Sequence, residues 1–122
     1  MGTVPEDGLT HLRVTLSETA YLGPGRADLL ELISSTGSIA AAGKAMGMSY
    51  KRAWSLVQAL NAGFGSPLVE ASRGGKEQGA ALTEAGREVL ERYRGMQEAT
   101  RKVIARDVEA LAALMSDMST KK

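Results

Sequence analysis

The stretch that decides the fold is Ser38–Leu60, which reads SIAAAGKAMGMSYKRAWSLVQAL. Ser38 and Ser49 each precede a run of helix-favouring residues, and a serine hydroxyl can cap a helix by accepting hydrogen bonds from its first free amides. Gly47 tolerates the positive φ that a tight turn between two helices requires. The stretch therefore predicts two helices joined by a short turn, over residues 39–46 and 50–62.

Small and apolar residues lie where a helix-turn-helix needs them. Ala42 and Gly43 leave room for the second helix to cross the first, Met46 and Met48 flank the turn, and Ala53 faces inward. The first turn of the second helix is polar and basic, as a helix that enters the major groove of DNA must be. Because all of these features occur together, they favour a helix-turn-helix over an ordinary helical hairpin in a bundle.

The flanking segments predict the remaining elements of a winged helix-turn-helix. A period-two alternation of apolar and polar residues predicts a strand over 10–17, and helical spacing predicts a helix over 26–36. After the central stretch, we expect a strand over 68–72, a glycine-rich loop over 73–80 and a returning strand over 81–83. The expected fold class is mainly α, with a small β-hairpin wing and a long C-terminal dimerisation helix.

The last helix is predicted from Thr83 to about Asp117, which is too long for its apolar stripe to be buried on one small domain. Its apolar residues recur in alternating steps of four and three, which is the spacing of a coiled-coil seam. We expect the same helix of a second copy to cover the stripe, giving a homodimer; the alternative is a helix that folds back on its own domain. The expected seam consists of Ile104, Val108, Leu111, Met115 and Met118.

These elements divide the chain into four expected parts. Residues 1–8 are expected to form a disordered tail, and 9–83 a winged helix-turn-helix DNA-binding domain. Residues 84–118 are expected to form the dimerisation helix, with a short tail over 119–122.

Composition narrows the class of protein. The 122 residues are 43% hydrophobic and 4% aromatic, which suits one domain with an aliphatic core. No cysteine is present, which excludes disulfides, thiolate metal sites and cysteine nucleophiles. The sequence shows no signal-peptide pattern and no apolar run near the roughly 20 residues of a membrane span. We therefore expect a soluble, cytoplasmic protein that does not contact a membrane.

Charge is distributed unevenly along the chain, although 15 basic and 14 acidic residues nearly cancel. No acidic residue lies between Glu31 and Glu70, whereas Lys44, Lys51 and Arg52 all do. A basic central segment favours contact with nucleic acid, and chance clustering in a short chain is the alternative.

The residues that would support catalysis or ligand binding do not cluster. His11 is the only histidine and has no carboxylate at ligand spacing, while Asp28 and Glu31 are explained by the helix dipole and solvation. The segment RGGK at 73–76 lacks the spacing of a phosphate-binding Walker loop. We expect no enzymatic activity, no catalytic residue, no cofactor, no metal and no small-molecule ligand.

The central motifs resemble the N-terminal domain of the ModE family of molybdate-responsive regulators, and also the wider LysR-type helix-turn-helix. The motifs that carry this resemblance are GSI at 37–39, GMSYK at 47–51 and AW at 53–54, with RGGK at 73–76, GA at 79–80 and LTEAG at 82–86 for the wing and the next helix. The resemblance spans about 12–115 and implies a sequence-specific transcriptional regulator that binds a two-fold site on double-stranded DNA as a homodimer.

Two features depart from the family pattern. In full-length ModE regulators a molybdate-binding region follows this domain, whereas this sequence ends at Lys122. We therefore expect this protein to share the family's DNA binding but not its sensing of the oxyanion. Glu77 and Gln78 also interrupt the glycine run that is usual in the wing.

The candidate DNA-contacting residues lie on both predicted central helices and on the wing. Lys51 or Arg52 is expected to bind guanine O6 and N7 or to hold a phosphate, and the sequence does not choose between these roles. Arg73 and Lys76 are expected to reach the phosphate backbone or the minor groove, with an ordinary charged hairpin tip as the alternative. The full set is Ser38, Lys44, Ser49, Tyr50, Lys51, Arg52, Trp54, Ser55, Gln58, Arg73 and Lys76.

Several of these residues have a second interpretation. Ser49 is expected to cap its helix and to face a phosphate, and Ser38 and Lys44 are further phosphate candidates. Ser55 and Gln58 are as consistent with solvated helix surface as with DNA contact. Trp54, the only tryptophan, is expected to contact sugar or a thymine methyl group, or to pack against the wing or the neighbouring helix. Packing is favoured, because aromatic side chains stabilise cores strongly.

Two other functions remain open. A helix-turn-helix adaptor that acts through protein–protein contact is one, although the exposed basic turn at 50–52 argues against it. A non-specific architectural DNA-binding protein is the other, and the net charge of +1 argues against it, because such proteins rely on neutralising phosphates.

Overall fold

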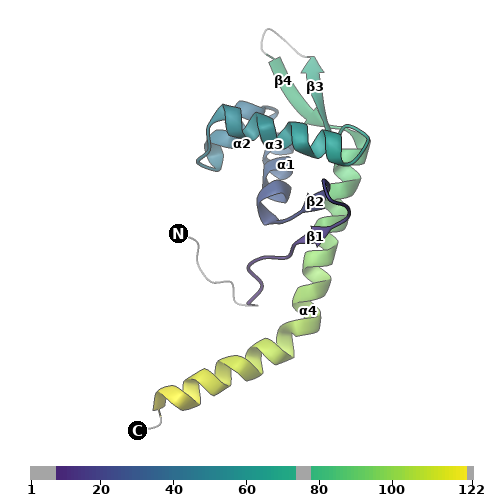
Figure 1. The fold of residues 1–122 in the computed structure, drawn as a ribbon. Coiled ribbons are helices and arrows are strands. Elements are labelled where there is room, and N and C mark those ends of the chain that lie inside the picture. Colours follow the sequence, from purple (N-terminus) through teal and green to yellow (C-terminus); the bar gives the residue numbers. More distant parts are fainter. Residues whose placement is uncertain (1–7, 74–77, 121–122) are drawn as a thin grey trace.

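The computed structural model describes residues 8–73 and 78–120, and the side chains of 73, 78 and 116–120 are outside that description. Figure 1 shows a small helical domain with a two-stranded wing at one end and a long helix that runs away from it. The elements in chain order are β1 (Val14–Thr15), β2 (Tyr21–Leu22), α1 (Pro24–Thr36), α2 (Ile39–Ala45), α3 (Tyr50–Gly63), β3 (Val69–Arg73), β4 (Gln78–Leu82) and α4 (Glu84–Thr120). The mainly α winged helix-turn-helix expected from the sequence is confirmed.

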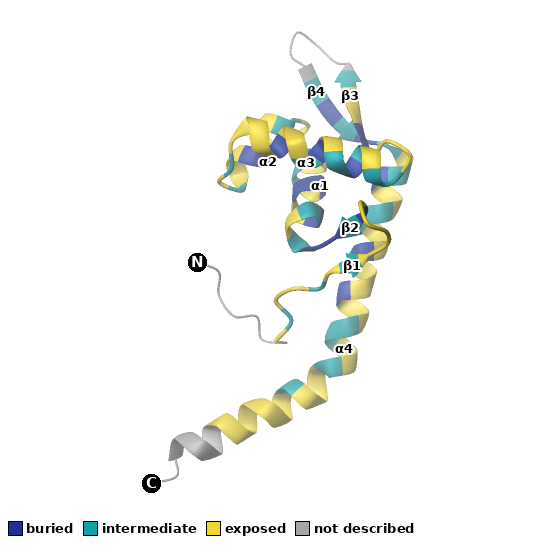
Figure 2. Ribbon diagram, in the orientation of Figure 1, coloured by how far each residue is buried: buried dark blue, intermediate teal, exposed yellow. Residues whose placement is uncertain are grey.

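The core lies where α1, α2, α3 and the start of the wing meet, and Figure 2 shows the buried residues concentrated there. α1 contributes Leu29, Leu30 and Ile33, all fully buried, and α3 contributes Leu60. Tyr93 of α4 closes the core from the side, also fully buried. Aliphatic side chains dominate this core, as the composition predicts.

The two central helices approach each other closely at a glycine. Gly43 of α2 is buried, and a Cβ atom added there would lie 2.8 Å from the Cβ of Ala53 on α3. No ordinary pair of carbon atoms comes this close, so only glycine fits at this crossing without a shift. The predicted need for a small residue at this position is therefore confirmed.

The turn and the helix starts also follow the sequence pattern. Gly47 has φ +72°, in the left-handed region that glycine tolerates. The hydroxyl of Ser38 accepts from the amide of Ala41 at 3.0 Å, and that of Ser49 accepts from the amide of Arg52 at 3.1 Å. Both predicted caps are therefore present.

The wing is longer than predicted and is attached to the end of α1. β3 pairs with β4 in antiparallel register, from Val69 opposite Leu82 to Arg73 opposite Gln78. The sequence places residues 78–80 in a loop, but they form part of β4 and pair with β3, and the amide of Ala80 donates to the carbonyl of Gly37 at 2.9 Å. This contact gives β4 a hydrogen bond that the local sequence pattern does not reveal.

The predicted strand over 10–17 is wrong in extent. Only Val14 and Thr15 form β1, which pairs with β2. The chain turns back immediately, because the amides of Leu16 and Ser17 both donate to the carbonyl of Ala20. The alternation at 12 and 14 does face the core, whereas Leu16 is 60% exposed at the turn.

α4 is fastened to the domain by polar contacts at its N-terminal half. Arg94 forms ion pairs with Asp28 and Glu31 of α1, both at 2.8 Å, so these two acids have a structural partner that the sequence interpretation missed. Burial alone would lower the pKa of Arg94, but its hydrogen bonds with the two carboxylates outweigh that effect and raise it. These pairs orient α4 against α1.

The segment before β1 also contacts α4. The hydroxyl of Tyr93 donates to the carbonyl of Leu12 at 2.7 Å, and burial raises the pKa of this phenol, which keeps the donor protonated. Further along α4, a Cβ atom on Gly8 would come within 2.9 Å of Val108. This N-terminal segment, residues 8–12, therefore lies against α4 at two points.

Among the described residues, no helix has both the length and the apolar character needed to cross a bilayer.

Two glycine-to-alanine substitutions test the close helix crossing. Gly43→Ala is expected to lower the free energy of unfolding by about 1–3 kcal/mol, because the added methyl group has no space beside Ala53. Gly95→Ala is the matched control, since Gly95 lies in α4 with nothing within 4 Å of its added Cβ. It is expected to raise the free energy of unfolding by up to about 1 kcal/mol, because alanine favours helices.

Urea denaturation at a fixed protein concentration measures both values. Equal effects of the two substitutions would contradict the close crossing of α2 and α3.

Candidate nucleic-acid interface

α3 is held by its inner face and exposes its outer face. Ala53, Val57 and Leu60 are at most 2% exposed and fix the helix to the core. The exposed residues of α3 include every candidate that the sequence placed on it: Tyr50, Lys51, Arg52, Trp54, Ser55 and Gln58. Because the inner face is rigidly packed, the backbone positions from which these side chains project are fixed.

The two basic residues of α3 project in different directions. Successive residues are about 100° apart around a helix, so Lys51 lies near the middle of the exposed face, and Arg52 lies at one edge. Ser49, the exposed cap, sits at the same end of α3. Within the part of the chain that the structure describes, no acidic side chain forms an ion pair with Lys51 or Arg52. Both cations are therefore available to an anionic partner.

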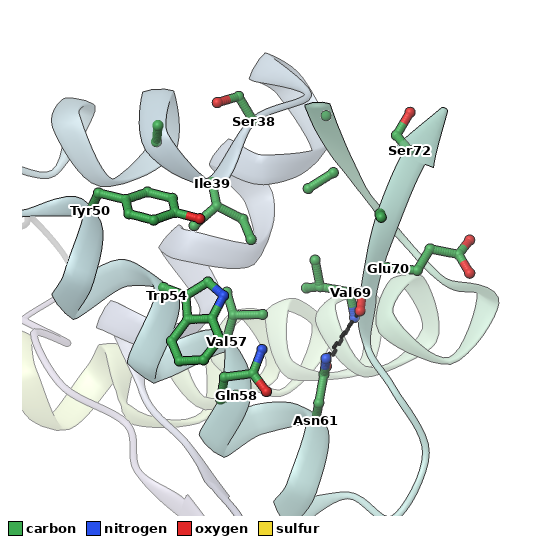
Figure 3. Close-up of a pocket in the computed structure, with 14 residues that line it drawn as sticks. Ser38, Ile39, Tyr50, Trp54, Val57, Gln58, Asn61, Val69, Glu70 and Ser72 are labelled. Atoms are coloured by element: carbon green, nitrogen blue, oxygen red, sulfur yellow. Dashed lines mark hydrogen bonds between the residues drawn. The ribbon is translucent and has the colours of Figure 1, made fainter. Parts of the chain in front are cut away.

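A groove of about 620 Å³ separates α3 from the wing. Figure 3 shows Tyr50, Trp54 and Gln58 on the α3 side and Val69 of β3 across from them. Ser38, at the start of α2, lines the same groove. The structure thus brings together four of the predicted site residues: Ser38, Tyr50, Trp54 and Gln58.

Trp54 is more exposed than the sequence suggests. The sequence favours packing against the wing or the neighbouring helix, whereas Trp54 is 46% exposed and forms part of the groove wall. The reason is its position on α3: it lies next to buried Ala53 in sequence but about 100° away around the helix. The aromatic surface is therefore accessible.

The other predicted site residues lie outside the groove. Lys44 is exposed in the last turn of α2, and Lys51, Arg52 and Ser55 are exposed on α3 but do not line the groove. Arg73 ends β3, and its side chain is outside the described part of the structure. Lys76 lies outside the described residues altogether.

Asn61 is a positioning residue that the sequence interpretation missed. Its side-chain oxygen accepts from the amides of Leu68 and Val69 at 2.8 and 3.1 Å, and its side-chain nitrogen donates to the carbonyl of Val69 at 3.1 Å. One side chain thereby joins the end of α3 to the first strand of the wing. A polar residue on the largely buried side of a helix, just before a glycine-rich turn, was the signal that could have revealed it.

Comparisons with known proteins agree with this geometry. MopB of Rhodobacter capsulatus, a molybdenum-pterin-binding protein, is 45% identical over 78 residues, which are 63% of this chain and 29% of MopB. The transcriptional regulator ModE of Haemophilus influenzae is 40% identical over 73 residues (59% and 29%). The DNA-binding transcriptional dual regulator ModE of Escherichia coli is 37% identical over 71 residues (58% and 27%). The chain spans less than a third of the length of these relatives.

Two solved structures share the fold. The complex of CbnR_DBD with DNA has a TM-score of 0.57 at 29% identity, over 71% of this chain and 95% of that one. VV2_1132, a LysR family transcriptional regulator, has a TM-score of 0.54 at 20% identity, over 74% of this chain and 29% of that one. At this identity the likeness supports the fold only.

The family model for the bacterial regulatory helix-turn-helix protein, lysR family, matches residues 26–87. This match covers more than half of the chain and contains α2, α3 and the wing. The resemblance to LysR-type and ModE regulators indicated by the sequence motifs is confirmed. The chain therefore belongs to the lysR family of bacterial regulatory helix-turn-helix proteins.

Proposed function

We propose that this protein is a sequence-specific DNA-binding transcriptional regulator that places α3 in the major groove. The observation that carries this proposal is the exposed outer face of α3, on which Lys51 and Arg52 have no acidic partner among the described residues. A rigid helix with free donors at its N-terminal end is the element that helix-turn-helix proteins use to contact base edges.

The comparisons support the same function. Three relatives carry the name of the transcriptional regulator ModE in different organisms, and the CbnR_DBD structure was solved with DNA. We infer that the chain acts by binding rather than by catalysis, and that it works in the cytoplasm, where bacterial DNA lies. A net charge of +1 favours this local, sequence-reading interface over a non-specific architectural role.

Individual side chains are assigned roles from their positions. Lys51 and Gln58 face outward on α3, so we propose that they read base edges, with Gln58 suited to adenine N6 and N7. Arg52 lies at the edge of the exposed face, where we propose that it holds a phosphate. Lys44 and the Ser49 hydroxyl are further phosphate contacts, and Arg73 and Lys76 are proposed to reach the adjacent backbone from the wing.

We propose that residues 9–83 form the DNA-binding unit and that 84–118 pair with the same helix of a second copy. The exposed apolar residues of α4 support a shared surface, because Val103 is 79%, Leu111 63%, Leu114 58% and Met115 72% exposed. In Figure 2 most of the C-terminal half of α4 is exposed. Such a stripe on one protomer is unfavourable in water unless a partner covers it.

The seam differs from the one that the sequence predicts. Val108 is half-buried because the chain's own Gly8 lies against it, and Ile104 is likewise half-buried. Val103 and Leu114, which the predicted seam omits, are exposed instead. The proposed dimer surface is therefore shifted around α4, away from the N-terminal segment. Paired domains would bind half-sites about 34 Å apart or a multiple of that distance.

Alanine substitutions distinguish base reading from phosphate binding. Lys51→Ala is expected to weaken binding to a selected duplex by about 1–3 kcal/mol and to relax the base preference at one position of each half-site. Arg52→Ala is expected to weaken binding to all sequences alike and to reduce the slope of log K against log salt by about 1 per protomer. The measurements are fluorescence-anisotropy titrations against duplexes selected by the wild type from a randomised pool.

Arg92→Ala supplies the matched control, because it also removes one positive charge but lies on α4 with a side chain 75% exposed. Its DNA affinity should equal that of the wild type. Wild-type affinity in both α3 variants would refute the proposed interface, and a wild type that selects no duplex at low salt would favour an adaptor.

A charge on the stripe of α4 tests the homodimer. Leu111→Glu is expected to shift the protein from dimer to monomer in sedimentation at micromolar concentration, since a carboxylate would be buried in the paired surface. Ala113→Glu, exposed and about 200° around the helix from Leu111, should leave the dimer intact. A wild type that sediments as a monomer would end the dimer proposal.

A further inference from the structure

The groove between α3 and the wing has walls of unusual character for a surface that meets DNA. Tyr50 and Trp54 lie one helical turn apart on its α3 side, 56% and 46% exposed (Figure 3). Half-buried Ile39 also lines the groove, together with Val57 and Val69, which are at most 5% exposed. Aromatic side chains are large apolar surfaces, and leaving two of them exposed side by side is unfavourable in a free protein. The exposed aromatic surface of this groove therefore favours a bound partner that covers it.

The described lining of the groove offers an anion no positive side chain. Ser38 and Tyr50 bring the N-terminal ends of α2 and α3 to the groove, but the charged side chain in this described lining is that of Glu70, which directs its carboxylate away from α3 (Figure 3). The amide of Asn61 is occupied by the backbone of Leu68 and Val69. The cations of α3 lie outside the groove. A phosphate would therefore gain less here than beside Lys51 or Arg52.

We propose that Tyr50 and Trp54 are specificity-determining residues that hold the 5-methyl group of a thymine, at the edge of each half-site nearest the wing. This inference rests on the proposed function, with α3 in the major groove. Among the groups that base edges display there, the thymine methyl group is the one that is apolar. Tyr50 begins α3 and Trp54 follows one turn later, so both lie at the end of the helix that contacts base edges.

Deoxyribose is the other apolar part of DNA, and its contact would carry no sequence information. The two occupants differ in one measurable respect. A thymine contact makes the affinity depend on the methyl group at one position, whereas a sugar contact leaves the affinity equal with or without that methyl group.

The experiment replaces each thymine of a wild-type-selected duplex, in turn, by deoxyuracil, which removes only the methyl group. For the wild type, we expect about a fourfold loss of affinity at one thymine of each half-site, as burial of one methyl-sized group implies. Trp54→Ala is expected to abolish that penalty while leaving the salt slope unchanged. Trp54→Phe, which keeps an aromatic ring, should retain a smaller penalty at the same thymine.

Leu16→Ala is the matched control, because it truncates an exposed apolar side chain at the turn after β1, distant in the chain from the groove-lining residues. It should keep both the affinity and the penalty of the wild type. Circular dichroism shows whether each variant is folded. If Trp54→Ala is unfolded, the penalty measured with Trp54→Phe provides the test.

Four results would overturn the inference. If Trp54→Ala keeps both the affinity and the deoxyuracil penalty of the wild type, the methyl contact lies elsewhere. If Trp54→Ala weakens binding to the thymine and deoxyuracil duplexes by the same factor, Trp54 contacts sugar. A wild type that binds its selected duplex with no penalty at any thymine would refute methyl reading and leave DNA binding standing. Failure of the wild type to select any duplex would instead refute the proposed function, and this inference with it.

Discussion

The close approach of α2 and α3 is the constraint on which the rest of the structure depends. Gly43 lets α3 come within contact distance of α2 through Ala53, and that contact sets the direction in which α3 leaves the turn at Gly47. With the inner face of α3 fixed to the core, the backbone positions from which the outward side chains project are fixed as well. A shift at this crossing would move the whole exposed face together, because packed helices move as rigid units.

Much of this arrangement could be predicted from the sequence, because local chemistry specifies it. Serine caps, a glycine turn and small residues at a crossing act over a few residues, and Ser38, Gly47 and Ser49 behave as their types predict. Long-range contacts were missed for the opposite reason. The hydrogen bond from Ala80 to Gly37 and the ion pairs of Arg94 join residues far apart in the chain, and periodicity contains no information about them.

In the candidate site, too, local features could be predicted from the sequence and long-range contacts could not. Helical geometry placed the exposed residues of α3 correctly, but it could not reveal that Tyr50 and Trp54 face a groove, since the opposite wall comes from the wing. Nor could spacing show that Val108 of α4 is covered by the chain's own N-terminal segment at Gly8. In each case the local pattern identified which residues are apolar, and the tertiary packing decided what covers them.

The attachment of the wing has a consequence for the proposed contact with DNA. Asn61 joins β3 to the end of α3, and the carbonyl of Gly37 holds β4, so the spacing between helix and wing is set before any duplex arrives. A rigid template of this kind loses little conformational entropy on binding. If the shape of the duplex does not fit this template, the duplex must bend or twist, and the free energy of that deformation varies with base sequence. Base pairs that the protein never touches would thereby contribute to its choice of site, through their stiffness alone.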